Sequence, residues 1–234
     1  MKLQDATVFI TGANRGLGLA FARHALEHGA RKVYGAARDA SSIRLPGVVP
    51  VALDVTDPAQ VAAAARDCGD VTMVVNNAGI ASFGNLLVAD SIAATQRMME
   101  TNVYGLLRVS QAFAPVLAAK GGGALLNVLS IASWLSGPML AAYAVSKAAA
   151  WSATNGLRND LRAQGTQVLG MHVGFIDTDL TRGMDVPKLA PEVVVARAFA
   201  ALENGDSEVA IDELSQQIKR GLSNEPGIYI DFAR

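Results

Sequence analysis

Short apolar runs alternate with helical patterns along most of the chain. The runs are nearly continuous in apolar residues, unlike strands that face water on one side. Between them lie segments with helical periodicity, one ended by glycine and one opened by an Asp-Pro start signal. The expected strands are 6–11, 32–37, 48–54, 71–77, 124–130 and 166–173, and the expected helices are 17–29, 57–69, 91–120 and a segment that includes 141–150.

Repeated alternation of this kind predicts an α/β fold, with a mostly parallel sheet covered by helices on both faces. Right-handed crossovers then give a doubly wound, Rossmann-like arrangement. The sequence shows no linker with a shift in composition, no low-complexity segment and no strong internal repeat. We therefore expect a single domain over residues 1–234, with a further helix within 185–205 and a last strand at 208–212. The tail from Glu213 gives no clear prediction.

Ligands of doubly wound folds sit outside the carboxyl ends of the strands, so the residues that follow each strand carry the most information. The first strand is followed by TGANRGLG, in which glycine occupies positions 12, 16 and 18. The spacing is G-x-x-x-G-x-G rather than the G-x-G-x-x-G fingerprint. Glycine permits a tight turn, and the start of the next helix favours an anion. The loop is either purely structural or a phosphate site, and its place between strand and helix favours the phosphate.

The second strand ends at Ala37, where dinucleotide folds that prefer NAD usually carry a carboxylate. Arg38 follows, and Arg15 lies within the glycine-rich loop. Arginine binds phosphate through a bidentate fork, so two cations near one expected site favour NADP(H), with NAD(H) still possible. The competing interpretation is that both arginines are solvated and that Asp39 pairs with Arg38.

Polar residues also follow the other expected strands. Asn102 is unusual because asparagine is unfavourable inside a helix, although it could simply bond to backbone in a kink. Ser130 comes at the end of the fifth strand. The remaining strand-end candidates are Asp54, Val55, Asn76, Asn77, Ala78 and Gly79.

The alanine-rich stretch AAYAVSKAAA places Tyr143 and Lys147 four residues apart, on one face of a helix. Alanine is the best helix former and lets neighbouring backbones approach closely. On this stretch alone the pair is equally well a packed ring beside a snorkelling surface cation. The polar groups at the strand ends decide between the two interpretations.

Composition excludes several other functions. The formal net charge of −1 gives no support for a nucleic-acid or membrane-surface partner. Cys68 is the one cysteine, and we expect it to be inert packing at a helix end. The histidines at 24, 28 and 172 lack metal-ligand spacing, so no metal is expected. No signal-peptide core or membrane-spanning run occurs, and the expected location is the cytoplasm.

Taken together, these motifs resemble the short-chain dehydrogenase/reductase family. The resemblance rests on Thr11-Gly12-x-x-x-Gly16-x-Gly18, Asn76-Asn77-Ala78-Gly79, Asn102, Ser130 and Tyr143-x-x-x-Lys147, in that order. It implies a sheet of about seven strands and a nicotinamide cofactor. The implied catalytic residues are Asn102, Ser130, Tyr143 and Lys147. The implied cofactor contacts are Thr11, Gly12, Asn14, Arg15, Gly16, Leu17, Gly18, Ala37, Arg38, Asp54, Val55, Asn76, Asn77, Ala78, Gly79, Tyr143, Lys147, Gly174, Ile176 and Thr178.

Two positions depart from the family pattern. The usual Pro-Gly after the sixth strand reads Val173-Gly174 here, and loss of the proline should loosen that turn. Leu129 stands where many relatives have a first serine, which leaves Ser130 alone.

The implied chemistry interconverts a ketone or aldehyde and an alcohol. Tyr143 would act as general acid/base, with its pKa lowered by the nearby Lys147 ammonium. Ser130 would hydrogen-bond the developing alkoxide, and Asn102 would hold a water that links Lys147 to solvent. These roles replace the packing interpretation of the Tyr143–Lys147 pair.

The substrate is expected to be apolar, because residues near Ser130 form an apolar candidate wall. The alternative for each of these residues is a place in the core or in a subunit contact. The candidates are Ile131, Trp134, Leu135, Met139 and Leu140, together with Met184 in a substrate loop at approximately 177–191.

Three alternatives remain open: a 3-oxoacyl reductase of lipid metabolism, a non-catalytic NADP(H)-sensing regulator, and a structural oligomer with a relic site. The first would need a basic docking surface, to which Arg97, Arg108 and Arg158 could contribute. In relatives, the helices that hold Asn102 and Tyr143 pack against a partner, so we expect a homodimer or homotetramer.

Overall fold

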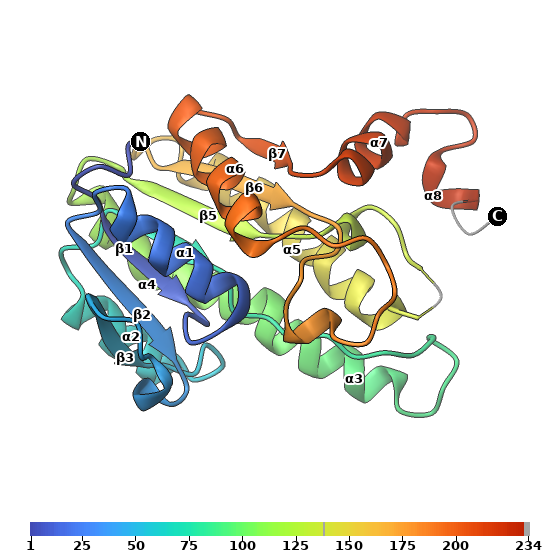
Figure 1. Cartoon of the computed structure of the whole chain (residues 1–234), viewed down its shortest axis with the longest axis horizontal. Helices are drawn as coiled ribbons and strands as arrows, with labels where there is room; N and C mark the ends of the chain where they lie inside the picture. Colours follow the sequence, from blue (N-terminus) through green and yellow to red (C-terminus); the bar gives the residue numbers. More distant parts are fainter. Residues whose placement is uncertain (138, 232–234) are drawn as a thin grey trace.

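A parallel sheet of seven strands forms the centre of the protein, seen in a computed structural model that describes residues 1–137 and 139–231 (Figure 1). Its spatial order is β3-β2-β1-β4-β5-β6-β7, and each neighbouring pair is parallel. The order of the strands reverses between β1 and β4, and the crevice at the carboxyl ends of these two strands is the expected ligand site. The strands are β1 (Thr7–Thr11), β2 (Lys32–Ala37), β3 (Val48–Ala52), β4 (Met73–Asn76), β5 (Ala124–Val128), β6 (Gln167–His172) and β7 (Glu208–Ala210).

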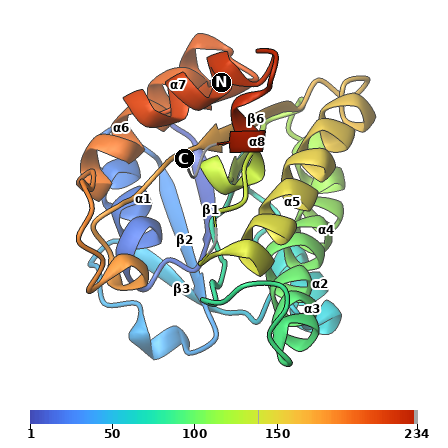
Figure 2. The same ribbon diagram turned by 90° about the vertical axis from the view of Figure 1, so that its right-hand side faces the viewer.

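Helices cover both faces of the sheet, as Figure 2 shows in end view. One face packs against α1 and α6, and the other packs against α2, α4 and α5. The expected doubly wound α/β fold is therefore confirmed. The helices are α1 (Gly16–Glu27), α2 (Pro58–Asp67), α3 (Ser91–Met99), α4 (Leu106–Ala118), α5 (Ala141–Asp160), α6 (Pro191–Asn204), α7 (Glu213–Gly221) and α8 (Ile228–Asp231).

Alternate residues of each strand enter two separate apolar cores. In β1, Val8 and Ile10 pack under α1 and α6, whereas Phe9 points to the opposite core. Phe9 lies 4.5 Å, ring to ring, from Phe113 of α4. Because both faces are buried, the strands read as continuous apolar runs although their side chains still alternate.

The expected helix 91–120 contains a π-helical segment, Glu100–Gly105, between α3 and α4. Such segments displace the backbone hydrogen bonds of a helix and are frequent at functional sites. Asn102 lies inside this segment, and Gly105 lies directly against Val55, whose Cγ2 atom is 2.7 Å from the position of an added Cβ.

The tail, which the sequence left open, folds as α7 and α8 beside the β7 edge of the sheet (Figure 1). Asp212 caps α7 by accepting hydrogen bonds from the Ser215 N–H (2.9 Å) and hydroxyl (2.7 Å). Across residues 1–137 and 139–231, none of the helices combines the length and the apolar character needed to span a bilayer.

Cys68 has the inert position expected for it. It is 2% exposed at the end of α2, and burial raises the pKa of its thiol to about 11. His28 likewise lies at the end of α1, with its Nδ1 atom 2.9 Å from the carbonyl oxygen of His24. Among the described residues, no group of three His, Cys, Asp or Glu side chains is arranged to hold a metal ion.

Candidate active site

The ends of β1 and β4 are joined by the motif residues that follow them. The Thr11 hydroxyl accepts hydrogen bonds from the backbone N–H groups of Asn77 (3.0 Å) and Ala78 (2.9 Å). In return, the Asn77 amide donates to the carbonyl oxygens of Thr11 (2.8 Å) and Gly12 (3.2 Å). The two motifs, 65 residues apart in sequence, therefore form one rigid edge of the crevice.

The glycine-rich loop is packed so closely that a side chain at Gly18 would collide with its neighbours. A Cβ atom on Gly18 would lie 2.1 Å from the Gly12 carbonyl oxygen and 2.6 Å from the Asn77 amide nitrogen. Gly12 and Gly16 have φ angles of +67° and +52°, which favour glycine. Arg15, the residue before α1, makes no side-chain cap at this helix start, whose N–H groups favour an anion. These features fit the pyrophosphate of a dinucleotide.

The two arginines expected at the cofactor site have different surroundings. Arg38 is exposed directly beyond β2. The Arg15 guanidinium lies 3.5 Å from an Asp179 carboxylate oxygen and stays largely exposed. Asp39 accepts hydrogen bonds from the N–H (2.9 Å) and hydroxyl (2.7 Å) of Ser41, and in the described part of the chain it forms no ion pair with Arg38.

The side chains of two predicted cofactor residues form hydrogen bonds with other residues of the protein. The Asp54 carboxylate accepts from the Thr56 N–H (2.9 Å) and hydroxyl (2.8 Å). The Asn76 amide donates to Ser110 (3.0 Å) and Asn127 (2.9 Å) beneath the crevice, and its oxygen is buried without a partner among the described residues. Direct cofactor contacts from these two side chains stay predictions.

Asn102 fixes the turn after β4 to the π-helical segment. Its side-chain oxygen accepts from the Ile80 N–H (2.8 Å), and its amide donates to the Ile80 carbonyl (2.9 Å) and to the Ser146 hydroxyl (3.0 Å). The residue is 2% exposed. This arrangement resembles the backbone-bonding role left open from the sequence, and the water-relay role stays a prediction.

Ser130, Tyr143 and Lys147 meet at the carboxyl end of β5. Ser130 follows the strand and caps the next turn, its hydroxyl accepting from the Ala132 N–H at 3.1 Å. The Lys147 ammonium donates to the Val128 carbonyl at 2.8 Å and lies 5.7 Å from the centre of the Tyr143 ring. The Ser130 side chain also acts to lower the pKa of the Tyr143 phenol.

The pKa of Tyr143 differs from the one expected from the sequence. Burial raises it to about 12, and the hydrogen bond with Ser130 only partly opposes that shift. Burial also lowers the pKa of Lys147 to about 8. The expected net lowering of the tyrosine pKa is therefore wrong for this structure, because desolvation dominates.

The candidate substrate residues fall into two groups. Ile131, Trp134 and Leu135 are at most 9% exposed and pack with Ile218 of α7. Met139 is 62% exposed, and Leu140 and Met184 are half-buried. The first group matches the core alternative that the sequence left open, and its role as a pocket wall stays a prediction.

An apolar segment that was not predicted lies next to Met139 and Leu140. Its backbone is joined to theirs where the Gly84 N–H donates to the Met139 carbonyl at 2.9 Å and Gly84 pairs with Leu140. The exposed apolar residues of this segment are Ile80, Phe83, Leu86, Leu87 and Val88.

Hydrogen bonds hold the turn after β6, which lacks the proline. Asp212 accepts from the Gly174 N–H at 2.8 Å, and the Ile131 N–H donates to the Val173 carbonyl at 3.1 Å. Bonds between Asp177 and Leu189, and between Leu189 and Phe175, both 2.9 Å, close the base of the following loop. The expected loosening of this turn stays a prediction.

Thr178 lies beside the glycine-rich loop, since a Cβ on Gly16 would be 3.4 Å from its methyl group. The two residues share a cavity of about 420 Å³ with the predicted substrate loop. Its lining is Gly16, Asp177, Thr178, Asp179, Arg182, Gly183 and Lys188.

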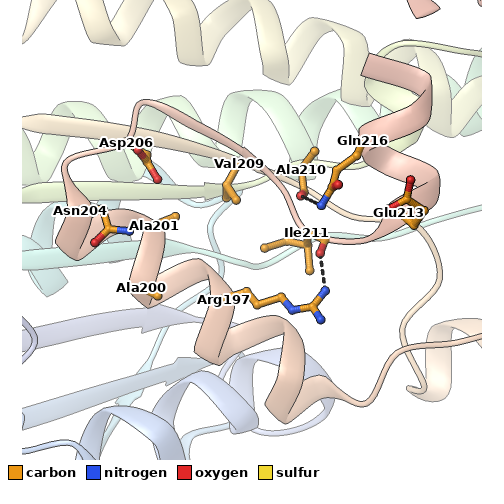
Figure 3. A pocket seen from close by; sticks show the side chains of 10 residues that line it. All are labelled: Arg197, Ala200, Ala201, Asn204, Asp206, Val209, Ala210, Ile211, Glu213 and Gln216. Atoms are coloured by element: carbon orange, nitrogen blue, oxygen red, sulfur yellow. Dashed lines mark hydrogen bonds between the residues drawn. The ribbon is translucent and has the colours of Figure 1, made fainter. Parts of the chain in front are cut away.

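A second hollow, of about 570 Å³, lies between α6, β7 and the start of α7 (Figure 3). The Arg197 guanidinium donates to the Ile211 carbonyl at 2.7 Å beside it. None of the predicted site residues lines this hollow, so it lies outside the candidate active site.

Sequence reasoning missed three polar residues next to the site. His172 was considered only as a metal ligand, yet its ring reaches the Ser130 carbonyl (3.1 Å). Asn127 bonds Asn76, and Ser146 bonds Asn102. A useful signal existed for Asn127, because it is the one polar residue in the run ALLNV.

The family is established by comparison with known proteins. The family described as short chain dehydrogenase matches residues 6–187. The chain therefore belongs to the short-chain dehydrogenase/reductase family of oxidoreductases. A short chain dehydrogenase of Burkholderia cenocepacia J2315, solved in complex with NADP, has a TM-score of 0.95 and 37% identity, and the match covers 100% of both chains.

The chain is also similar in sequence to two curated proteins. The 3-oxoacyl-[acyl-carrier-protein] reductase FabG of Vibrio cholerae is 31% identical over 79% of this chain and 79% of its own length. The short chain dehydrogenase tazN of Aspergillus terreus is 34% identical over 78% of this chain, and the match spans only 44% of the fungal protein.

Proposed function

We propose that the protein is an NADP(H)-dependent oxidoreductase that interconverts an apolar ketone or aldehyde and the corresponding alcohol. The observation that carries this proposal is the meeting of Ser130, Tyr143 and Lys147 next to the crevice formed by the glycine-rich loop. A sensing regulator would not need a hydroxyl, a phenol and a buried ammonium gathered at that place.

NADP(H), where bound, would supply or accept the hydride. The backbone of Gly12 to Gly18 and the start of α1 would hold its pyrophosphate. Arg38 and Arg15 would meet the 2′-phosphate, because no carboxylate occupies the end of β2. The NADP complex of the Burkholderia cenocepacia relative supports this preference. NAD(H) remains a weaker substitute in the proposal.

Tyr143 would act as a general acid in the reducing direction. Its pKa of about 12 keeps the phenol protonated at neutral pH, so a proton is available at its oxygen for the forming alkoxide. Ser130 would donate to the same alkoxide oxygen. Lys147, largely charged below its pKa of about 8, would favour the transient phenolate by its charge.

An apolar substrate is supported by the exposed side chains around the site. Phe83, Leu86 and Met139 are 51% to 62% exposed and belong to two segments that pair with each other beside α5. Exposed apolar patches of this kind mark ligand or protein contacts. The 177–191 loop, with Met184, would cover the substrate from the other side.

The main alternative is a 3-oxoacyl reductase, favoured by the similarity to FabG. The expected basic docking surface has little support, because Arg108 pairs with Glu100 at 2.7 Å and Arg158 bonds the Ser207 carbonyl at 2.8 Å. Activity on 3-oxoacyl thioesters rather than on simple apolar ketones would establish this alternative.

A homo-oligomer in the cytoplasm completes the proposal. Exposed apolar residues on the helical face support a subunit contact there, among them Ile92 on α3, Tyr104 in the π-helical segment and Val145 on α5. Light scattering of the purified protein would separate dimer, tetramer and monomer.

The decisive experiment follows NADPH oxidation with a panel of apolar ketones and aldehydes, for wild type and Tyr143→Phe, and repeats it with NADH. Turnover that requires NADPH and collapses in the variant is the expected result. Unchanged turnover in Tyr143→Phe would overturn the catalytic assignment. Binding of NADPH without turnover of any substrate would favour the sensor.

Cofactor preference is tested by Arg38→Asp. Loss of a charge-assisted bond costs about 1.5–3 kcal/mol, so the KM for NADPH should rise roughly 10- to 100-fold while that for NADH changes little. Arg44→Asp is a matched control in the same loop. Equal effects of Arg38→Asp on both cofactors would contradict the role given to this residue.

A further inference from the structure

A buried histidine connects the candidate catalytic serine to the edge strand of the sheet. His172 is the last residue of β6, and it is 0% exposed. Its Nδ1 atom lies 3.1 Å from the Ser130 carbonyl oxygen, and its Nε2 atom lies 3.2 Å from a carboxylate oxygen of Glu208 in β7. The ring thus bridges the two residues within one buried layer.

The rest of the ring is fixed by aromatic contacts. Trp134 stacks on it at 3.8 Å between ring centres, with 14° between the planes. Trp151 meets it edge-on at 6.3 Å. The Trp151 indole N–H also donates to Glu208 at 3.0 Å, so the histidine and its carboxylate partner are held by the same side chain. A ring packed in this way has one available orientation.

The two partners of His172 decide where its protons lie. A backbone carbonyl can only accept a hydrogen bond, so Nδ1 must carry a proton. Glu208 receives donors from Trp151 and Lys219, and the hydrogen bond from His172 is the largest cause that lowers its pKa to about 2. A carboxylate also only accepts, so the Nε2 contact needs a proton on Nε2, and both contacts are made together only when the ring carries both protons. Burial lowers the pKa of His172 and so favours the neutral ring, in which the Ser130 carbonyl favours the Nδ1–H form and Glu208 the Nε2–H form.

The carbonyl that receives this bond belongs to Ser130 itself. It also accepts from the Ser133 N–H at 3.0 Å, within the turn that Ser130 caps. On either side of it, the Leu129 N–H donates to Met171 of β6 at 2.8 Å and the Ile131 N–H donates to Val173, directly after β6, at 3.1 Å. The hydrogen bond from His172 connects β6 to Ser130, which lies between these two residues. It restricts rotation of the peptide group that follows Ser130 and hence the direction of the Ser130 hydroxyl.

We infer that His172, oriented by Glu208, is a positioning residue that holds the Ser130 hydroxyl in line for the carbonyl oxygen of the substrate. The inference rests on the proposed function, because it assigns the cause of the Ser130 geometry. It goes beyond the family motifs, since neither residue is part of them. Small displacements of a catalytic group cost large factors in rate, so loss of this bond should lower turnover.

The kinetic test is a double-mutant cycle. His172→Phe keeps a flat ring against Trp134 but removes both hydrogen bonds. It should lower kcat roughly tenfold, with the KM for NADPH and the melting temperature little changed. His172→Asn replaces Nδ1–H by an amide donor and should restore a large part of the loss. In a Ser130→Ala background, His172→Phe should cost less than about twofold, because the hydroxyl that it orients is already absent.

Opposite kinetic results would overturn the inference. An equal loss from His172→Phe in the wild-type and Ser130→Ala backgrounds would mean that the residue merely supports the fold. Equal losses in His172→Phe and His172→Asn would mean that the donor is irrelevant. Wild-type protein without turnover would instead count against the proposed function, and a second measurement then decides on His172.

That measurement is ¹⁵N NMR of the three histidine rings of the full chain, with His172→Asn used to assign the resonance. The expected result is a protonated Nδ1 on His172 that stays protonated as the pH rises past the ordinary histidine range of about 6.5. Glu208→Gln replaces the acceptor at Nε2 by an amide that can donate to it, so the Nδ1–H form should be kept in this variant. An unprotonated Nδ1 in the wild-type protein would overturn the inference whatever the enzyme turns over.

Discussion

Tyrosine and lysine lie next to each other at both ends of the parallel sheet. At the amino end, the Lys32 ammonium lies 2.6 Å from the Tyr34 hydroxyl and 3.0 Å from Asp70, and these contacts raise the pKa of Lys32. At the carboxyl end, the one hydrogen-bond partner of the Lys147 ammonium among the described residues is the Val128 carbonyl, and burial lowers the pKa of Lys147 to about 8. The carboxylate makes the first lysine a permanent cation, whereas burial makes the second titratable.

The comparison shows that surroundings, and not residue types, separate a structural pair from a reactive one. Burial raises the pKa of both Tyr34 and Tyr143, but only Tyr143 adjoins a serine and an open crevice. Perturbed pKa values at a cleft indicate a functional site, while those in an ion-pair network often indicate structure. Substitutions at the two ends of the sheet should therefore have different consequences.

Removal of the two phenol hydroxyls should give the largest contrast. Tyr143→Phe should reduce the rate of NADPH-dependent reduction by about 10³-fold, in the range for loss of a general acid. Tyr34→Phe should leave the rate within about twofold, because its partners Lys32 and Asp70 remain paired. Steady-state kinetics on both variants measures the contrast, and comparable losses in the two would remove the distinction.

The lysines should differ by a smaller factor. Lys147→Met should lower the rate on the order of 10²-fold, since it removes a charge beside the phenol and leaves the Val128 carbonyl without its donor. Lys32→Met serves as the matched control and should leave kcat unchanged. A Lys147→Met enzyme with wild-type kcat would show that the buried ammonium has no part in the reaction.

Two glycine substitutions, one in the cofactor loop and one in α5, should have opposite effects on stability. Gly18→Ala places a methyl group against the Gly12 carbonyl, so it should cost roughly 1–3 kcal/mol of stability and weaken NADPH binding. Gly156→Ala lies in α5 with nothing within 4 Å of the added methyl, and it should stabilise the protein by about 0.5–1 kcal/mol. Thermal unfolding with and without NADPH measures both, and tight NADPH binding by Gly18→Ala would contradict the fit of the loop.

The sequence predicted the parts of the molecule that depend on local patterns. The apolar runs located the strands of the sheet, with 32–37 matching β2 residue for residue. The spacing of the motifs predicted that Ser130, Tyr143 and Lys147 belong to one site. These signals work because periodicity and glycine tolerance are properties of neighbouring residues.

Properties set by distant contacts were not accessible in the same way. The direction of the Tyr143 pKa shift depends on burial and on where the Lys147 ammonium points, which spacing along a helix does not fix. The turn after β6 is bonded by Asp212, 38 residues away from Gly174. Glu208, the carboxylate partner of His172, likewise lies 36 residues further along the chain, in β7.

The titration of Lys147 tests the difference between the two ends of the sheet most directly. The measurement is kcat/KM for NADPH as a function of pH, which reports ionisations of the free enzyme. Because the lowered pKa of Lys147 is about 8 and that of Tyr143 is about 12, the reduction should be full below pH 8 and fall as the pH rises through that value. Lys32→Met should keep this profile, and Lys147→Met should lose it. A wild-type profile that stays flat through pH 8, or that rises there, would contradict the role of the buried, unpaired lysine.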